Sequence, residues 1–284
     1  MISPEEEEYI LSKAYVPEHI VSLMALISKG EPFLIKEDYI CFSKDNWLIF
    51  VGYPLSYDFT NEDIEGILND VIKRFQPEYT WFIAPEVPHS LIKSCRERES
   101  DEYYRLDLQG MEIKKDLRRI VKKASMELTI ERVKEISKEH KKLISEFIER
   151  EKPSPRVREL FFSMPEYVTR SKTAIVLTAW DKRKNLSAFY IIELAAEKFA
   201  TYVVGCHSKK NYVPRASDLL FLEMINLAKE QDKTYINLGL GVNEGIRRFK
   251  EKWGGVPFLR YEFCEYFSGH TKPLKLIREL ESKL

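Results

Sequence analysis

Short apolar runs with a period of two alternate along the chain with longer runs whose period is near 3.6, which predicts strands and helices respectively. In the first part, an apolar helix precedes strands in a hairpin, a second helix and two more strands. These elements are predicted at 17–28, 33–35, 39–43, 47–51, 61–75, 79–84 and 103–108.

A two-faced helix at 113–125 separates this part from a second series, with an apolar stripe on one side and basic residues on the other. The second series predicts a strand, two helices, three strands, a helix, a strand, a helix and a last strand. These elements are expected at 127–133, 137–150, 155–162, 173–180, 186–195, 199–206, 218–231, 235–239 and 243–253, with the last strand ending near residue 267.

Both parts thus place strands in a hairpin before a helix and a further strand. This order predicts a mixed α/β fold of the α+β class, with two similar domains in tandem at 1–125 and 126–284. Each domain would be a mostly antiparallel sheet flanked by helices. Because no residue-level repeat accompanies the repeated order, a single larger mixed domain stays open as an alternative.

Composition narrows the class of protein. The 284 residues carry 45 basic and 45 acidic side chains, so a polyanion would have to bind at a local patch. No apolar run approaches the roughly 18 residues of a membrane helix, and the acidic start differs from a secretory leader. The four cysteines lie far apart, so we expect neither a disulfide framework nor a metal site, and a reduced, cytoplasmic protein.

The basic side of the helix at 113–125 is one candidate patch. Residues 113–123 contain six basic residues and a single acidic one, Asp116. They could bind tRNA phosphates or a nucleotide-linked acceptor, or they could be the solvated side of an interdomain helix. The candidate anion-binding residues are Lys115, Arg118, Arg119 and Lys122.

The helix at 243–253 carries a motif. It resembles the last helix of GNAT acyltransferases, which often reads N-x-x-A-x-x-x-Y-x-x-x-G-F. The corresponding residues are Asn243, Ile246, Lys250, Gly254 and Gly255, with lysine at the tyrosine position and glycine at the final phenylalanine position. The run R-F-K-x-x-W-G-G looks like Fem-type aminoacyl transferases and the cytosolic domain of lysylphosphatidylglycerol synthetases, which are similar to two GNAT domains in tandem. Segments 103–108 and 117–124 resemble their Y-x-L-D-L and L-R-x-x-x-x-K-A join.

This resemblance implies a transferase that moves an acyl group, above all an aminoacyl group, onto an amine or hydroxyl of a small-molecule, lipid or peptide acceptor. The donor would be aminoacyl-tRNA or acyl-CoA, with tRNA as a partner and no tightly bound cofactor. In the loop that holds the pyrophosphate of acyl-CoA in GNAT enzymes, Asn211 stands for Gln or Arg and Pro214 for Gly, which removes an N–H donor. Asp218 adds a negative charge where a phosphate would lie, so binding of CoA is disfavoured. Arg215 offsets part of this loss of binding. The alternatives are an acyl-CoA-dependent N-acetyltransferase and a catalytically silent GNAT-like binding module.

Acyl transfer requires a stabilised oxyanion and proton transfers. We expect Lys250 to stabilise the oxyanion or leaving oxygen, with Arg247 on the same helix face. In open α/β sheets, ligands bind in the crevice outside the carboxyl ends of the strands. If Glu193 faces this crevice, burial would raise its pKa and it could act as a base. All three could instead be solvated surface residues. The residues expected to hold the donor are Tyr202, Val204, Gly205, Arg215, Ser217, Asn237, Gly239 and Asn243. Asn243 is also expected to cap the helix at 243–253.

Overall fold

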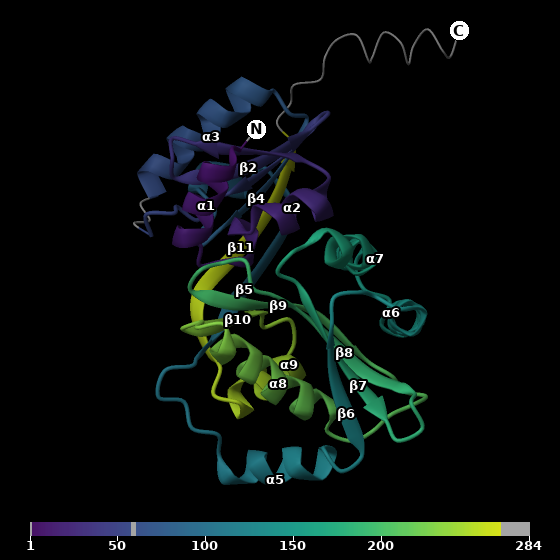
Figure 1. Ribbon diagram of the computed structural model, residues 1–284. Helices are drawn as coiled ribbons and strands as arrows, with labels where there is room; N and C mark the ends of the chain where they lie inside the picture. Colours follow the sequence, from purple (N-terminus) through teal and green to yellow (C-terminus); the bar gives the residue numbers. More distant parts are fainter. Residues whose placement is uncertain (1, 58–60, 268–284) are drawn as a thin grey trace, which may run out of the picture. The chain divides into compact units, whose positions relative to one another are not determined.

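The computed structural model describes residues 2–57 and 61–267, and the chain divides into two compact units (Figure 1). Unit 1 comprises Met1–Ser3, Ser28–Asp101 and Arg260–Leu284, and unit 2 comprises Pro4–Ile27 and Glu102–Leu259. The strands β5 (Cys95–Asp107) and β11 (Val256–Phe267) have residues in both units.

These units are defined by contacts between residues, whereas the predicted boundary near Ser125 rests on a repeated order of elements. The division into domains at 1–125 and 126–284 therefore stays a prediction. Its last part, residues 268–284, lies outside the described residues.

The sheet of unit 1 has the strand order β1-β2-β3-β4-β11, in which only β3 and β4 are parallel. Helix α3 connects the two parallel strands, and its buried residues Ile64, Leu68 and Val71 pack in one core with Phe50 and Phe82. The elements of this unit are β1 (Glu31–Ile35), β2 (Tyr39–Lys44), β3 (Trp47–Val51), α3 (Asn61–Phe75), β4 (Tyr79–Ala84) and α4 (His89–Ile92).

Unit 1 contains a disulfide between Cys95 and Cys264, whose Cα atoms are 5.5 Å apart. The expectation of no disulfide is therefore wrong. The two cysteines are separated by 169 positions, and only the pairing of strands brings them together, so their spacing in the sequence gives no sign of the bond. Cys41 and Cys206 are free and buried. The expected cytoplasmic location rested partly on reduced cysteines and stays a prediction.

The sheet of unit 2 has the order β5-β10-β9-β8-β7-β6, and only β9 and β10 are parallel. Its strands are β6 (Leu128–Val133), β7 (Ile175–Asp181), β8 (Leu186–Glu193), β9 (Phe199–His207) and β10 (Tyr235–Leu240). Its helical elements are α1 (Pro4–Lys13), η1 (Pro17–His19), α2 (Val21–Ser28), α5 (Lys115–Ala124), α6 (Lys138–Glu151), α7 (Pro155–Arg170), α8 (Ala216–Glu230) and α9 (Glu244–Lys252).

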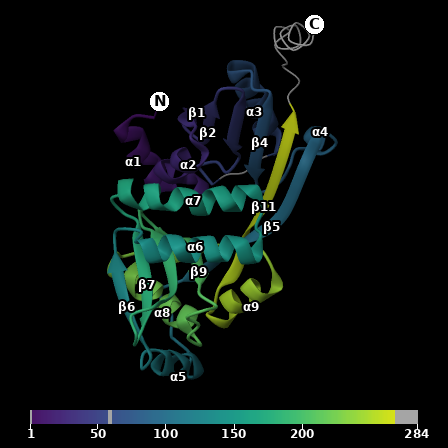
Figure 2. The same ribbon diagram turned by 90° about the vertical axis from the view of Figure 1, so that its right-hand side faces the viewer.

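Period-two alternation places the two faces of this sheet against different helices. On one face Ile236 and Leu238 of β10 pack with residues of α5, α8 and the turn after α9, Trp253 among them. On the other face Tyr235 packs with residues of α6 and α7, which run side by side in Figure 2. The α+β class, with mostly antiparallel strand pairing and flanking helices, is confirmed, although the strands form one sheet rather than a separate sheet for each domain. In the described part of the chain, no helix combines the length and apolar character needed to cross a membrane.

Two elements extend beyond their predicted ends. Strand β5 begins at Cys95 rather than at 103. The sequence did not predict its first half, because residues 96–100 are charged or polar and exposed and show no apolar alternation. Helix α7 continues past 162 and through Pro165 to Arg170, since Met164, Tyr167 and Val168 are buried in the core. Packing of that apolar face outweighs the helix-breaking preference of proline. Helix α1 was not predicted.

Candidate functional site

The parallel strands β9 and β10 stop pairing before either strand ends. Their register pairs join Phe199–Thr201 to Tyr235–Asn237 and go no further, while β9 continues to His207 and β10 to Leu240. The backbone groups of β9 that follow Thr201 are therefore not used by β10. The place where β9 and β10 separate, beyond Thr201 and Asn237, is called the opening. It lies at the carboxyl ends of two neighbouring strands, where ligands commonly bind in α/β sheets.

An extra residue in each strand follows the last shared pair. β9 advances from Tyr202 to Val204 while β8 advances by a single residue, and β10 advances from Asn237 to Leu240 while β5 advances by two. Such bulges bend a strand and increase its local twist. Because the two bulges lie on neighbouring strands at the same level, they account for the separation of β9 and β10.

Gly239 makes the bulge of β10 possible. Its φ is +70°, a backbone conformation that residues with a side chain rarely adopt. A Cβ on Gly239 would lie 3.9 Å from the Tyr202 carbonyl oxygen. Its N–H donates to Oδ1 of the buried Asn237 at 2.9 Å, and Nδ2 of Asn237 donates to the Tyr15 carbonyl at 3.4 Å. Asn237 thus fixes the backbone at the opening.

The Lys250 side chain is buried at the end of β10. Its Nζ donates to the carbonyl oxygens of Gly239 at 3.0 Å and Leu240 at 2.6 Å, and lies 5.3 Å from the centre of the Tyr104 ring. Two carbonyl dipoles and an aromatic face stabilise a cation there. The ammonium of Lys250 therefore lies at the carboxyl end of β10 rather than in water.

The glycines after α9 set the position of Lys250. Gly254 has φ +94° and ends the helix, and a Cβ on Gly255 would lie 2.8 Å from Leu238 Cδ1 and 3.0 Å from the Lys250 carbonyl oxygen. No larger residue fits at Gly255 without a shift of β10 or α9. The W-G-G run thus allows the close contact that brings Lys250 to the strand.

Asn243 and Arg247 occupy the exposed side of α9. The Asn243 side chain accepts a hydrogen bond from the Ile246 N–H at 3.0 Å, which confirms it as the helix N-cap. Arg247 lies one turn before Lys250 in the helix but is exposed where Lys250 is buried. The expected shared face is therefore split between solvent and core.

The start of α8 differs from the expectation in one respect. Arg215 is its N-cap, exposed and with φ +70°, and the Ser217 carbonyl accepts from the Tyr190 hydroxyl at 3.3 Å. Asp218 is buried, forms an ion pair with Lys252 and accepts from Trp253 Nε1 at 2.9 Å. Its negative charge is compensated by the protein, so it repels an incoming phosphate less than the sequence indicates.

The side chains of the predicted donor strand β9 pack inside unit 2. The rings of Tyr202 and Tyr190 are 4.9 Å apart, edge to face, and burial raises the pKa of the Tyr202 hydroxyl well above its usual range. A Cβ on Gly205 would lie 2.5 Å from atoms of both rings. Val204 is buried on the opposite face. The side chains of Tyr202 and Val204 are thus engaged in packing, and contact of this strand with a donor stays a prediction.

Glu193 is buried at the end of β8, and both of its oxygens have protein partners. Oε1 accepts from the N–H groups of Leu194 and Ala195, each at 2.8 Å, and Oε2 accepts from the hydroxyls of Tyr167 and of Ser171, the latter at 3.1 Å. Four donors on one carboxylate favour a structural role over that of a base.

The four residues of the predicted anion patch are all exposed on α5. Leu117, Val121 and Ala124 bury the other side of this helix against α8. Arg118 Nε donates to the Ile113 carbonyl at 2.8 Å, and Arg119 lies 3.8 Å from Asp116. The predicted two-faced character of the helix is confirmed, while binding of an anion stays a prediction.

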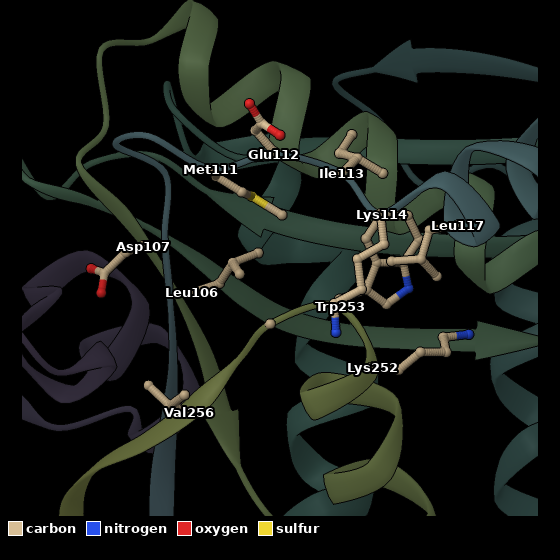
Figure 3. Close-up of a pocket in the computed structure, with 11 residues that line it drawn as sticks. Leu106, Asp107, Met111, Glu112, Ile113, Lys114, Leu117, Lys252, Trp253 and Val256 are labelled. Carbon is tan, nitrogen blue, oxygen red and sulfur yellow. The ribbon is translucent and has the colours of Figure 1, made fainter.

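The sequence did not indicate a pocket of about 310 Å³ next to this helix, lined by residues of 106–117 together with Lys252–Gly254 and Val256 (Figure 3). Trp253 was noted only as part of a motif. Nor did the sequence single out Glu18 of η1, whose pKa is raised by burial and partly lowered again by the Tyr103 hydroxyl. Nothing in the local sequence pattern marks Glu18 as a buried carboxyl.

Comparison with solved structures identifies the fold. FemX aligns over 98% of this chain and 99% of its own, with a TM-score of 0.60 and 11% identity. L-PGS from Bacillus licheniformis aligns over 97% and 95%, with a TM-score of 0.59 and 17% identity. A tandem GNAT protein from the clavulanic acid biosynthesis pathway aligns over 94% and 95%, with a TM-score of 0.57 and 9% identity. No protein-family model and no curated protein matches the chain.

These likenesses cover nearly the whole chain, so the fold of this protein is that of tandem GNAT proteins. The resemblance to Fem-type transferases and lysylphosphatidylglycerol synthetases, expected from the C-terminal motif, is confirmed at the level of the fold. At these identities the likeness establishes architecture and leaves activity to be argued from the site.

Proposed function

We propose that this protein is an acyltransferase that moves an acyl group, specifically an aminoacyl group, from an activated donor to an amine or hydroxyl acceptor. The observation that carries the proposal is the buried Lys250 ammonium at the end of β10, where β9 and β10 stop pairing. The shared fold of FemX and the tandem GNAT protein supports the same class of reaction.

The reacting carbonyl of the donor would lie in the opening between β9 and β10. Backbone groups of β9 beyond Thr201 would hold the donor, and the positive charge of Lys250 would stabilise the oxygen that becomes negative in the transition state. The carbonyls of Gly239 and Leu240 hold the ammonium in place before the reaction, so little reorganisation is needed.

The remaining groups would act around this centre. Arg247, exposed on α9, and Arg215, exposed at the start of α8, would contact the donor's phosphates, with Ser217 and Asn243 at the same helix starts. Asn237 and Gly239 would shape the opening. We propose aminoacyl-tRNA as donor, no tightly bound cofactor, and a small-molecule, lipid or peptide acceptor.

An acyl-CoA donor is the second candidate. The observation in its favour is the pairing of Asp218 with Lys252, which removes part of the charge that would oppose a pyrophosphate at the start of α8. Pro214 still lacks the N–H that the GNAT loop supplies.

The test offers the purified protein labelled aminoacyl-tRNA and labelled acetyl-CoA in parallel, each with a mixture of amines and alcohols. We expect label to move from aminoacyl-tRNA, and Lys250→Met to slow this transfer by about 100-fold, as does loss of one oxyanion donor. The control is Arg248→Ala, which removes only an exposed ion pair with Glu244. Thermal unfolding of both variants separates lost chemistry from lost structure.

Transfer from acetyl-CoA alone would establish the second candidate. Transfer from neither donor, with the protein folded, would leave a binding module without catalytic activity. Transfer that persists in a folded Lys250→Met variant would remove the proposed role of this lysine.

A further inference from the structure

The pocket beside α5 lies wholly within unit 2 and has no role in the chemistry proposed above. Its volume of about 310 Å³ is at the lower end of the range for small-molecule sites. A single ring system with its sugar matches this size better than an extended ligand does. The charged groups around the pocket indicate which kind of ring it would hold.

The walls of the pocket are mainly apolar. Met111 and Ile113 are half-buried, so part of each side chain stays accessible to a ligand, and Trp253 closes the wall from the end of α9. Flat apolar walls with a polarisable thioether favour the faces of an aromatic base. The apolar lining residues are Leu106, Met111, Ile113, Leu117, Trp253 and Val256.

Charges of opposite sign line the pocket on different sides. In the view of Figure 3 the carboxylates of Asp107 and Glu112 lie on one side, and Lys114 and Lys252 lie on the other. Lys252 is paired with Asp218 and Asp107 with Arg105, whereas the exposed ammonium of Lys114 has no ion-pair or hydrogen-bond partner among the described residues. Carboxylates accept hydrogen bonds from exocyclic amino groups of bases, and an unpaired ammonium binds a phosphate.

The positive charge continues from the pocket along α5. Arg118 folds back so that its Nε donates to the carbonyl of Ile113, a pocket residue, and its terminal nitrogens have no hydrogen-bond partner in the described part of the chain. Lys115 and Lys122 extend the exposed basic side over a ten-residue helix, about 15 Å long. A free nucleotide would use one end of this surface, whereas a strand would use its length.

The pocket is also connected to the start of α8. Lys252 and Trp253, which line it, both bind Asp218 in the first turn of that helix. Asp218 therefore joins the pocket wall to the helix whose N-cap, Arg215, is proposed to contact the donor.

We propose that this pocket binds the 3′-terminal base of a nucleic-acid strand, a base with an exocyclic amino group, while the phosphates that follow lie along the basic side of α5. The inference deepens the proposed function and rests on it for its purpose, because the strand would carry the acyl group on its terminal ribose. Binding itself requires no acyl group and no transfer.

The experiment measures binding of a labelled single-stranded RNA of about eight nucleotides, a usual site size, by fluorescence anisotropy. Three strands differ only at the 3′ end, which is adenosine, uridine or a ribose without a base. We expect the adenosine strand to bind about tenfold more tightly than the abasic strand, with the uridine strand between them.

Two variants and two controls accompany it. Met111→Trp fills the pocket and is expected to remove the preference for a terminal adenosine. Arg118→Glu is expected to weaken all three strands and to lower the salt slope by about 1. Lys142→Glu makes the same charge change on the exposed side of α6, and Lys250→Met removes the proposed chemistry; both are expected to keep the preference.

Equal affinity for the adenosine and abasic strands, or an undiminished preference in Met111→Trp, would overturn the assignment of the pocket. Adenosine monophosphate that binds as tightly as the strand, with no effect of Arg118→Glu, would show a free-nucleotide site and overturn the role of α5. Because no acyl group is present, these results are independent of whether the protein transfers one.

Discussion

Each unit has a parallel strand pair among its described residues, and the two pairs have the same order of elements but different ends. In unit 1, β3 and β4 pair over five residues, Trp47–Val51 with Tyr79–Ile83, and the N–H of Gly52 adds a hydrogen bond to Ile83 at 2.7 Å. In unit 2, β9 and β10 pair over three residues and then separate. One pair is closed to its end, and the other is open.

The cause of the difference is local. β9 and β10 each carry an extra residue after their last shared pair, and Gly239 supplies the left-handed conformation that the bulge of β10 requires. The pairing of β3 with β4 has no such shift, and the rings of Phe50 and Phe82 stack across it. Bulges in the strands, rather than the helix or the core, therefore distinguish the open pair from the closed pair.

The largest expected effect tests the closed unit. Cys95→Ser removes the bond to Cys264, and loss of a disulfide that joins distant segments costs roughly 2–5 kcal/mol. We expect hydrogen exchange to show lower protection in β1–β4 and unchanged protection in β7–β9. Reductant should reproduce the effect in the original protein and add nothing to the variant. An equal loss in both units would show that they do not unfold separately.

The next effect concerns the strand that precedes the open end. Glu193→Leu leaves four buried or half-buried donors without an acceptor, among them Tyr167 and Ser171, and we expect a loss of about 3 kcal/mol in urea unfolding. Glu149→Leu, on the exposed side of α6, is the control and should change little. If Glu193→Leu kept full stability and abolished transfer, the predicted role as a base would be restored.

A buried histidine allows acid to distinguish the two units. Burial lowers the pKa of His140 to about 4. Because the neutral form is favoured in the folded protein, its contribution to stability is complete above pH 6.5 and is lost as the pH falls toward 4. We expect about 2 kcal/mol to be lost from unit 2 between pH 7 and pH 5. His140→Gln, which does not titrate, should remove this loss, and an unchanged pH dependence would contradict the assignment.

The smallest effects come from matched glycine substitutions. Gly205→Ala in β9 places a Cβ 2.5 Å from atoms of Tyr190 and Tyr202, and we expect a cost of roughly 1–3 kcal/mol. Gly66→Ala in α3 meets nothing within 4 Å and should stabilise that helix by up to about 1 kcal/mol. Thermal unfolding measures both. A Gly205→Ala substitution that left the melting temperature unchanged or raised it would show that the ring packing beside the opening is not tight.

Most elements of the fold were predictable from local pattern. Strands such as Trp47–Val51 and Tyr79–Ala84 have the predicted bounds, because alternation and turn residues mark both ends. The polar first half of β5 and the part of α7 beyond Pro165 were not predictable, since neighbours distant in sequence stabilise them.

The site was predictable only in part. The motif around Lys250 was recognisable, whereas only the structure shows that its ammonium lies at the end of β10. Asp218 and Glu193 were interpreted as groups directed at a ligand, yet each is occupied by donors from other elements. A side chain's partners depend on the packing of several segments, which no single segment specifies.

The amino-acid sequence by itself determined the order of strands and helices, the two-faced helix α5, the N-cap Asn243 and the glycines that end α9, because each follows from periodicity or from backbone preference within a few residues. Only the tertiary structure decided that β9 and β10 separate, that Cys95 bonds Cys264, and that a pocket lies between α5 and Trp253. These features arise where residues far apart in the sequence meet, and their energies depend on register and packing rather than on local conformation.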